Sequence, residues 1–119
     1  MSNKTDTKKK AILVSHTHWD RAWYLTFNEF RVRLVRMIDR IIELLESNSS
    51  YNCFVLDGQV VLIEDYLEIR PDKESHIRAL IQQGRLVIGP WYVLPDLFLV
   101  SGESIIRNLQ IGLEMSNEF

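Results

Sequence analysis

The segment Ala11–Tyr24, AILVSHTHWDRAWY, runs from a short apolar stretch straight into histidines, an aspartate and two tryptophans. The apolar stretch, residues 11–15, is continuous rather than alternating, which predicts a central β-strand covered on both faces. His16, His18 and Asp20 are spaced two residues apart, so in an extended backbone their side chains project from the same side. Imidazole nitrogen and carboxylate oxygen together suit Zn²⁺ best among the divalent metals. The segment therefore predicts a metal site at the end of a strand.

Helical and strand-like patterns alternate along the rest of the chain. Apolar residues recur at three- and four-residue steps from about Asn28 to Ser47, which predicts an amphipathic helix with a solvated, charged outer face. A polar loop at 48–50 separates this helix from a second apolar run. The further elements expected, in chain order, are a strand at 52–56, a helix at 60–69, a helix that opens at Pro71 and ends at Gly84, a strand at 86–88 and a helix that Ser101 caps.

This order of elements predicts an α/β fold. Strands that alternate with helices pair in parallel through right-handed crossovers, so their carboxyl ends meet on one rim of the sheet. Ligands of α/β proteins bind at that rim. We therefore expect His18, Asp20, Asp57 and Trp91, each of which follows a predicted strand, to lie in one neighbourhood.

The composition is that of an ordinary globular domain. With 119 residues, of which 46% are hydrophobic and 25% charged, the chain has the length of one domain. A net charge of -2 gives no electrostatic reason to expect a nucleic acid or membrane partner, and no stretch approaches the ~18 apolar residues of a membrane span. We interpret residues 1–10 as a flexible polar tail, not a signal peptide. Cys53 is the only cysteine and has no disulfide partner, so we expect a cytoplasmic location.

The spacing of histidine and aspartate has two interpretations on its own. Pairs of histidine and carboxylate are ordinary structural contacts, so His18 could be a core histidine hydrogen-bonded to Asp20. As a metal site, the motif needs at least one or two further ligands from elsewhere in the protein.

The aromatic and acidic residues beside the predicted strand ends also have two interpretations. The flat faces of Trp23 and Trp91 suit the C–H faces of a sugar, but large aromatic side chains also close the ends of a sheet. Asp57 and Asp96 could orient substrate hydroxyls or take part in acid/base chemistry; equally, both could simply belong to turns.

Four blocks of the sequence resemble successive signatures of the glycoside hydrolase family 38 α-mannosidases, in that family's order and spacing. The blocks are His16–Tyr24 (HTHWDRAWY), Asp57–Gln59 (DGQ), Gly89–Asp96 (GPWYVLPD) and Phe98–Ser104 (FLVSGES). The resemblance is greatest to bacterial members and covers the chain from Ala11 to about Gly112.

This resemblance implies a retaining exo-α-mannosidase with one Zn²⁺ at the bottom of its pocket. Residues 11–119 would then be the first, incomplete portion of the family's N-terminal α/β barrel-like catalytic domain. By the family's pattern, His18 and Asp20 are two of the zinc ligands, while His16 only supports them. Trp23 matches the tryptophan that lines the mannose subsite. From their expected place on the rim, we also expect Asp57, Trp91 and Asp96 to bind the α-mannoside.

The chain also departs from the family's pattern. Members commonly carry Glu at the positions of Ala22 and Leu97, so two polar positions near the predicted site are apolar here. The family's nucleophilic aspartate, its remaining zinc histidine and its acid/base carboxylate are all expected beyond Phe119. We therefore expect no catalytic residue within this chain, and no mannosidase activity from the 119-residue polypeptide alone.

Two other functions also fit parts of the sequence. A metal-dependent hydrolase of the amidohydrolase type would use both His16 and His18 as ligands of a metal that activates water, but it leaves the later blocks unexplained. A non-catalytic remnant would keep the motif residues only for packing, since two protein ligands are too few for tight zinc binding.

Overall fold

The computed structural model describes residues 8–119 and has the predicted α/β architecture. Residues 1–7 of the predicted tail lie outside the described residues. The elements are β1 (His16–Thr17), α1 (Phe27–Ser47), β2 (Phe54–Leu56), α2 (Val61–Leu67), the 3₁₀ helix η1 (Pro71–Lys73), α3 (Glu74–Gln82), β3 (Leu86–Val87) and α4 (Gly102–Glu118). Among these residues, no helix is both long and apolar enough to cross a bilayer.

The three strands form one parallel sheet in the order β1-β2-β3, as the alternation of elements predicts. His16 lies opposite Val55, and Phe54 lies opposite Leu86. The Val55 N–H donates to the carbonyl of Ser15 at 2.9 Å. All three strands run in the same direction, so their carboxyl ends lie on one rim.

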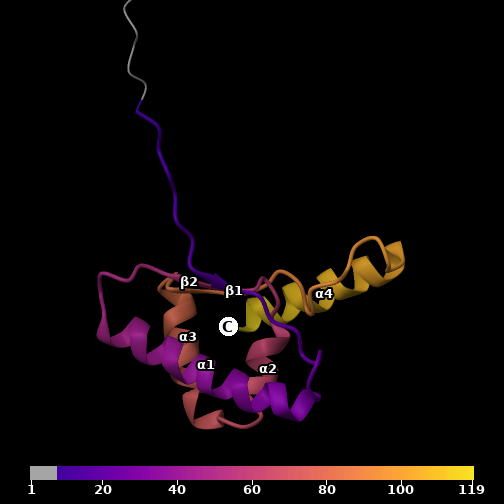
Figure 1. Cartoon of the computed structure of the whole chain (residues 1–119), viewed down its shortest axis with the longest axis horizontal. Coiled ribbons are helices and arrows are strands. Elements are labelled where there is room, and N and C mark those ends of the chain that lie inside the picture. Colours follow the sequence, from indigo (N-terminus) through magenta and orange to yellow (C-terminus); the bar gives the residue numbers. More distant parts are fainter. Residues whose placement is uncertain (1–7) are drawn as a thin grey trace, which may run out of the picture.

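The first strand differs from its prediction in its position along the chain and in its burial. It comprises His16–Thr17 rather than residues 11–15, and it lies at an edge of the described sheet, whose central strand is β2. The register explains why pairing stops. If the register of His16 and Val55 is continued toward the N-terminus, Leu13 lies opposite Asn52. Asn52 belongs to the loop before β2, so the sheet offers no strand for Leu13 to pair with. Leu13 is consequently 98% exposed, and Figure 1 shows this N-terminal arm leading away from the helices.

Helices α1, α2 and α3 lie on one side of the strands, as Figure 1 shows, and they supply most of the buried core. The apolar positions of α1 fall at helical spacing, so one face of this helix is buried while the opposite face carries charge. A capping box between Thr26 and Glu29 starts α1. Gly84, at a φ of 69°, follows α3 in the left-handed conformation expected of a terminating glycine.

Helix α4 packs through a glycine against the loop that follows β3. The Ser101 hydroxyl accepts a hydrogen bond from the Ser104 N–H at 3.2 Å, which confirms the predicted cap. Gly112 is the buried residue of this helix, and a Cβ there would clash with the backbone of residues 90–92. Half of the large apolar side chains of α4, namely Ile106, Ile111 and Leu113, are exposed, and the other half are only partly buried. The helix therefore contacts the body through a narrow strip that includes Gly112.

Candidate metal and substrate site

The two predicted metal ligands lie together just beyond the end of β1. His18 Nε2 is 3.4 Å from Asp20 Oδ2, and both side chains are exposed. The opposite ring nitrogen, His18 Nδ1, is 3.4 Å from Asp57 Oδ2. The imidazole therefore lies between two carboxylates, one at each nitrogen.

Asp57 occupies a tight turn directly after β2. Its φ is 47° and that of Gly58 is 68°, so two successive residues adopt the left-handed conformation that aspartate and glycine tolerate best. Only 9% of the Asp57 side chain is exposed. Its Oδ2 accepts a hydrogen bond from the Trp19 N–H at 2.7 Å and another from Gln59 Nε2 at 2.7 Å. The turn thus directs the Asp57 carboxylate toward the loop that carries His18.

Gln59 is a buried polar residue whose amide joins three segments of the chain. Its Nε2 donates to the Trp19 carbonyl at 2.7 Å as well as to Asp57, and its Oε1 accepts from the Leu94 N–H at 3.1 Å. The side chain is almost completely buried, yet both ends of its amide are hydrogen-bonded. Gln59 therefore connects the turn after β2 to the loops at residues 18–20 and 91–96.

The loop after β3 reaches the same rim, as the strand order predicts. The Trp91 N–H donates to the Gly58 carbonyl at 3.1 Å, and the Val60 N–H donates to the Trp91 carbonyl at 2.8 Å. These bonds extend the parallel pairing by one bridge, between Gln59 and Trp91. The expected neighbourhood of His18, Asp20, Asp57 and Trp91 is thus present.

The remaining predicted substrate residues lie at the surface. Trp23 is 77% exposed, so its ring is available to a ligand. Asp96 is also exposed, and its carbonyl accepts from the Leu99 N–H at 3.0 Å. Trp19, in contrast, packs edge-on against Phe30 with 5.8 Å between ring centroids. The substrate roles of Trp23, Asp57, Trp91 and Asp96 stay predictions.

A bidentate ion pair joins the loop after β1, residues 18–26 (the site loop), to helix α2. Arg21 donates from Nε and Nη2 to the two oxygens of Asp65, each at 2.8 Å. Asp65 is buried on α2, and this hydrogen bonding raises the pKa of Arg21. The Arg21 guanidinium also lies 5.0 Å from the centre of the Phe27 ring. The ion pair anchors the chain one residue after Asp20.

The donors present match part of a zinc site. In a tetrahedral site with metal–ligand bonds of about 2.0 to 2.2 Å, neighbouring donors are about 3.3 to 3.6 Å apart, a range that includes the 3.4 Å between His18 Nε2 and Asp20 Oδ2. Asp57 faces the other ring nitrogen, so its carboxylate does not converge on the same point. Within residues 8–119, no group of three His, Cys, Asp or Glu side chains is arranged to hold a metal ion. The described residues fit half of a tetrahedral zinc site.

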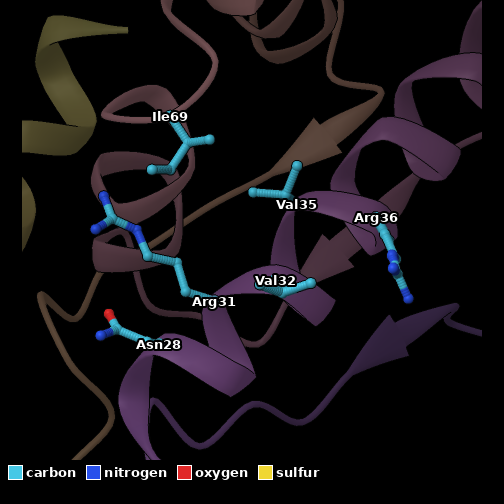
Figure 2. Close-up of a pocket in the computed structure, with 6 residues that line it drawn as sticks. All are labelled: Asn28, Arg31, Val32, Val35, Arg36 and Ile69. Carbon is cyan, nitrogen blue, oxygen red and sulfur yellow. The ribbon is translucent and has the colours of Figure 1, made fainter.

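A groove of about 370 Å³ lies away from this rim, between α1 and the segment after α2. Figure 2 shows its apolar lining, which includes Val32, Val35 and Ile69, with Arg31 and Arg36 beside it. None of the predicted site residues lines the groove, and no carboxylate does. A glycosidase needs two carboxylates, so this groove is not the predicted substrate site.

Sequence reasoning missed the residues that support the site. Gln59 belongs to the Asp-Gly-Gln block and Arg21 to the first motif, but the sequence predicts a role for neither residue. A glutamine that follows a turn aspartate is a weak signal, because only the fold shows that the amide is buried against the backbone of Trp19. The predicted support role of His16 stays untested; its Nδ1 lies 3.2 Å from the Thr17 carbonyl.

Known proteins resemble the chain in sequence and in structure. Residues 8–119 match the model of the "Glycosyl hydrolases family 38 N-terminal domain". A "Putative mannosylglycerate hydrolase" of Halalkalibacterium halodurans is 47% identical over 112 residues, which are 94% of this chain and 12% of the relative. "Alpha-mannosidase 2" of Arabidopsis thaliana is 31% identical over 91 residues, 75% of this chain and 8% of the relative.

The crystal structure of an alpha-mannosidase from Enterococcus faecalis V583 superposes with a TM-score of 0.86 at 45% identity, over 88% of this chain and 12% of that one. A second Enterococcus faecalis structure, of a protein in glycosyl hydrolase family 38, gives a TM-score of 0.81 at 42% identity over the same shares. The chain thus spans only 8 to 12% of the length of the proteins that it matches. From the match over residues 8–119 and these likenesses, we conclude that the chain belongs to glycosyl hydrolase family 38.

Proposed function

We propose that this chain supplies two zinc ligands and part of the sugar-binding surface of a retaining α-mannosidase. The observation that carries the proposal is the pair His18 Nε2 and Asp20 Oδ2, held 3.4 Å apart at the carboxyl end of β1 in a member of this family. Bound there, zinc would hold the vicinal hydroxyls of mannose as a template. Trp23 and Trp91 would present aromatic faces to the sugar ring, and Asp96 a carboxylate to its hydroxyls.

The 119-residue polypeptide alone should be inactive. Retaining hydrolysis needs a nucleophilic carboxylate and an acid/base carboxylate roughly 5 to 5.5 Å apart, with a substrate held between them. The described carboxylates near His18 have other partners: Asp20 faces the imidazole, and Asp57 is bonded to Trp19 and Gln59. An assay of the purified chain with an aryl α-mannoside and added Zn²⁺ should give no turnover. Turnover at enzyme-like rates would contradict the proposal.

A chimera tests the ligand assignment in an active context. In the Enterococcus faecalis α-mannosidase, the matching segment can be replaced by residues 8–119, since the two superpose closely. We expect His18→Ala and Asp20→Ala each to remove bound zinc, measured as metal content, and with it the activity. His16→Ala should keep most of both. His76→Ala, on α3, is the matched control for loss of an exposed histidine.

The same series separates the competing hydrolase. If zinc content collapses in His16→Ala as it does in His18→Ala, both histidines are ligands and the amidohydrolase type of site is favoured. If zinc content survives all of these substitutions, the motif residues serve only for packing.

The substrate we propose is an α-mannoside of the mannosylglycerate type. The supporting observation is the 47% identity, over 94% of this chain, to the relative named as a putative mannosylglycerate hydrolase. The chimera should therefore gain in the ratio of kcat/KM for mannosylglycerate over aryl α-mannoside relative to its parent. Ala22→Glu and Leu97→Glu, which restore the family's common residues, should move this ratio back if these positions govern substrate choice. An unchanged ratio would remove the substrate assignment from this part of the protein.

A further inference from the structure

We infer that Asp57 and Gln59 are positioning residues that hold the peptide groups of Trp19 and thereby fix the spacing of the proposed zinc ligands. Trp19 is the single residue between His18 and Asp20. The inference rests on the proposed function, because the spacing matters only if these two side chains bind a metal.

Both backbone polar groups of Trp19 are hydrogen-bonded to side chains of the turn after β2. Its N–H donates to Asp57 Oδ2 at 2.7 Å, and its carbonyl accepts from Gln59 Nε2 at 2.7 Å. Gln59 also donates to the same Asp57 oxygen, so the three groups form a closed network. A residue held at both ends of its own backbone has little freedom to rotate, and the side chains before and after it share that restraint.

The network is itself anchored in buried structure. Gln59 is 1% exposed, and its Oε1 is occupied by the Leu94 N–H. Asp57 and Gly58 form a turn in which both residues are left-handed. The Gly58 carbonyl accepts a hydrogen bond from the Trp91 N–H, which joins this turn to the loop after β3. A glutamine in such a place cannot shift without leaving a buried amide or a buried carbonyl unpaired. We call the hydrogen bonds of Asp57 and Gln59 to the Trp19 peptide groups the Trp19 clamp. Because its members are anchored in buried structure, the clamp belongs to the rigid part of the rim.

Asp57 acts on His18 from the side that a metal would not occupy. Its Oδ2 faces Nδ1 of the imidazole at 3.4 Å, whereas Asp20 faces Nε2. A carboxylate at the second nitrogen of a metal-binding histidine orients the ring. Removing such outer partners weakens metal binding about 10- to 100-fold.

The first experiment needs no metal and uses the whole chain. Amide hydrogen exchange followed by NMR should show slow exchange at Trp19 and fast exchange at Asp20, whose N–H makes no hydrogen bond among the described residues. Asp57→Gly removes the carboxylate while keeping the left-handed turn, and Gln59→Met removes all three hydrogen bonds of the amide at similar side-chain size. Both should speed exchange at Trp19. Asp57→Asn keeps an acceptor oxygen and should restore slow exchange in part.

Matched controls change the same groups elsewhere on the surface. Asp72→Gly removes an exposed carboxylate near α3, and Gln82→Met changes an exposed glutamine at the end of that helix. Neither should alter exchange at Trp19. Fast exchange at Trp19 in the wild-type chain would overturn the clamp outright, and it would do so even if Asp57→Gly fails to fold.

The second experiment measures Zn²⁺ affinity by calorimetry on the same variants and on His18→Ala, all placed in the Enterococcus faecalis chimera after removal of its metal, because two protein ligands are too few for tight zinc binding by the chain alone. If the chimera with the wild-type segment binds Zn²⁺ no better than His18→Ala, the proposed function fails, while the exchange data still test the hydrogen bonds to Trp19. If the wild type does bind, Asp57→Gly and Gln59→Met should bind about 10- to 100-fold more weakly, with Asp57→Asn between them. Affinity equal to that of the controls, despite lost protection at Trp19, would overturn the positioning role.

Discussion

The helical side of the molecule and the rim of its sheet are stabilised by different kinds of interaction. On the helical side, residues such as Leu34, Leu45 and Tyr66 are completely or almost completely buried, and they interlock α1, α2 and α3. Along the rim and the N-terminal arm, large apolar side chains such as Leu13 and Phe98 are each 98% exposed. Burial of apolar surface therefore stabilises one side, whereas the other depends on a few directed polar contacts.

This difference explains how the candidate site is held in place. Apart from Trp19, which packs against Phe30, the loop after β1 contributes little buried apolar surface. It is fixed by the hydrogen bonds of Asp57 and Gln59 and by the ion pair between Arg21 and Asp65. Directed contacts of this kind fix position closely but add little free energy each. Substitutions on the two sides should thus differ in what they damage, namely stability on one side and geometry on the other.

The comparison is tested most strongly by truncating one leucine on each side. Leu45→Ala, in the core between the helices, should lower the free energy of unfolding by about 2 to 5 kcal/mol, because it leaves a cavity in close-packed surroundings. Leu13→Ala, in the exposed arm, should change it by less than about 0.5 kcal/mol. Urea unfolding followed by far-UV circular dichroism measures both. Equal losses would mean that the arm is packed in solution.

The ion pair that joins the two sides should have an intermediate effect. Arg21→Met leaves the buried Asp65 carboxylate without its partner and should cost about 2 to 3 kcal/mol, since an uncompensated buried charge is expensive. Replacing both members, as Arg21→Met with Asp65→Leu, should recover most of this loss in the same urea experiment. Arg40→Met, which breaks the exposed pair with Glu43, is the control and should cost less than about 0.5 kcal/mol. An Arg21→Met loss as small as that of Arg40→Met would show that Asp65 is not effectively buried.

Sequence patterns predicted the helical side more accurately than the rim. The period of apolar residues in 28–47 predicted α1 to within a residue, because a helix that buries one face must repeat that spacing. The apolar run 11–15 predicts a covered strand, yet strand pairing begins only near His16, because the length of a strand also depends on where its neighbouring strand begins. The shared rim of His18, Asp57 and Trp91 followed from parallel topology.

The clamp was out of reach of sequence reasoning because it depends on two segments of the chain meeting. Gln59 is 40 residues from the Trp19 carbonyl that it binds, and nothing local distinguishes this amide from that of a solvated glutamine. Residues that act through the backbone of another segment leave no periodic pattern, and only the fold identifies them.

The smallest expected difference between the two sides lies in a pair of tyrosines. The Tyr66 hydroxyl donates to Asp39 Oδ1 at 2.6 Å on the helical side, and the Tyr92 hydroxyl donates to Glu64 Oε2 at 2.9 Å near the rim. Burial, and then the hydrogen bond to Asp39, raise the pKa of Tyr66. Tyr66→Phe should cost about 1 kcal/mol at neutral pH, and Tyr92→Phe a few tenths, because its hydrogen bond is exposed to water.

Alkaline titration of stability sharpens this last comparison. Because the folded pKa of Tyr66 lies above the unfolded value of about 10, the stability linked to its protonated form is complete below pH ~10 and is lost as pH rises toward the folded pKa. Urea unfolding between pH 8 and 11 should therefore show a steeper decline in the wild type than in Tyr66→Phe. Burial, and then the hydrogen bond to Glu64, also raise the pKa of Tyr92, but less than that of Tyr66, so the decline in Tyr92→Phe should lie between those of the wild type and Tyr66→Phe and closer to the wild type. Identical slopes for the wild type and Tyr66→Phe would mean that this phenol is not held by the helical core, and the contrast between the two sides would then rest on the apolar residues alone.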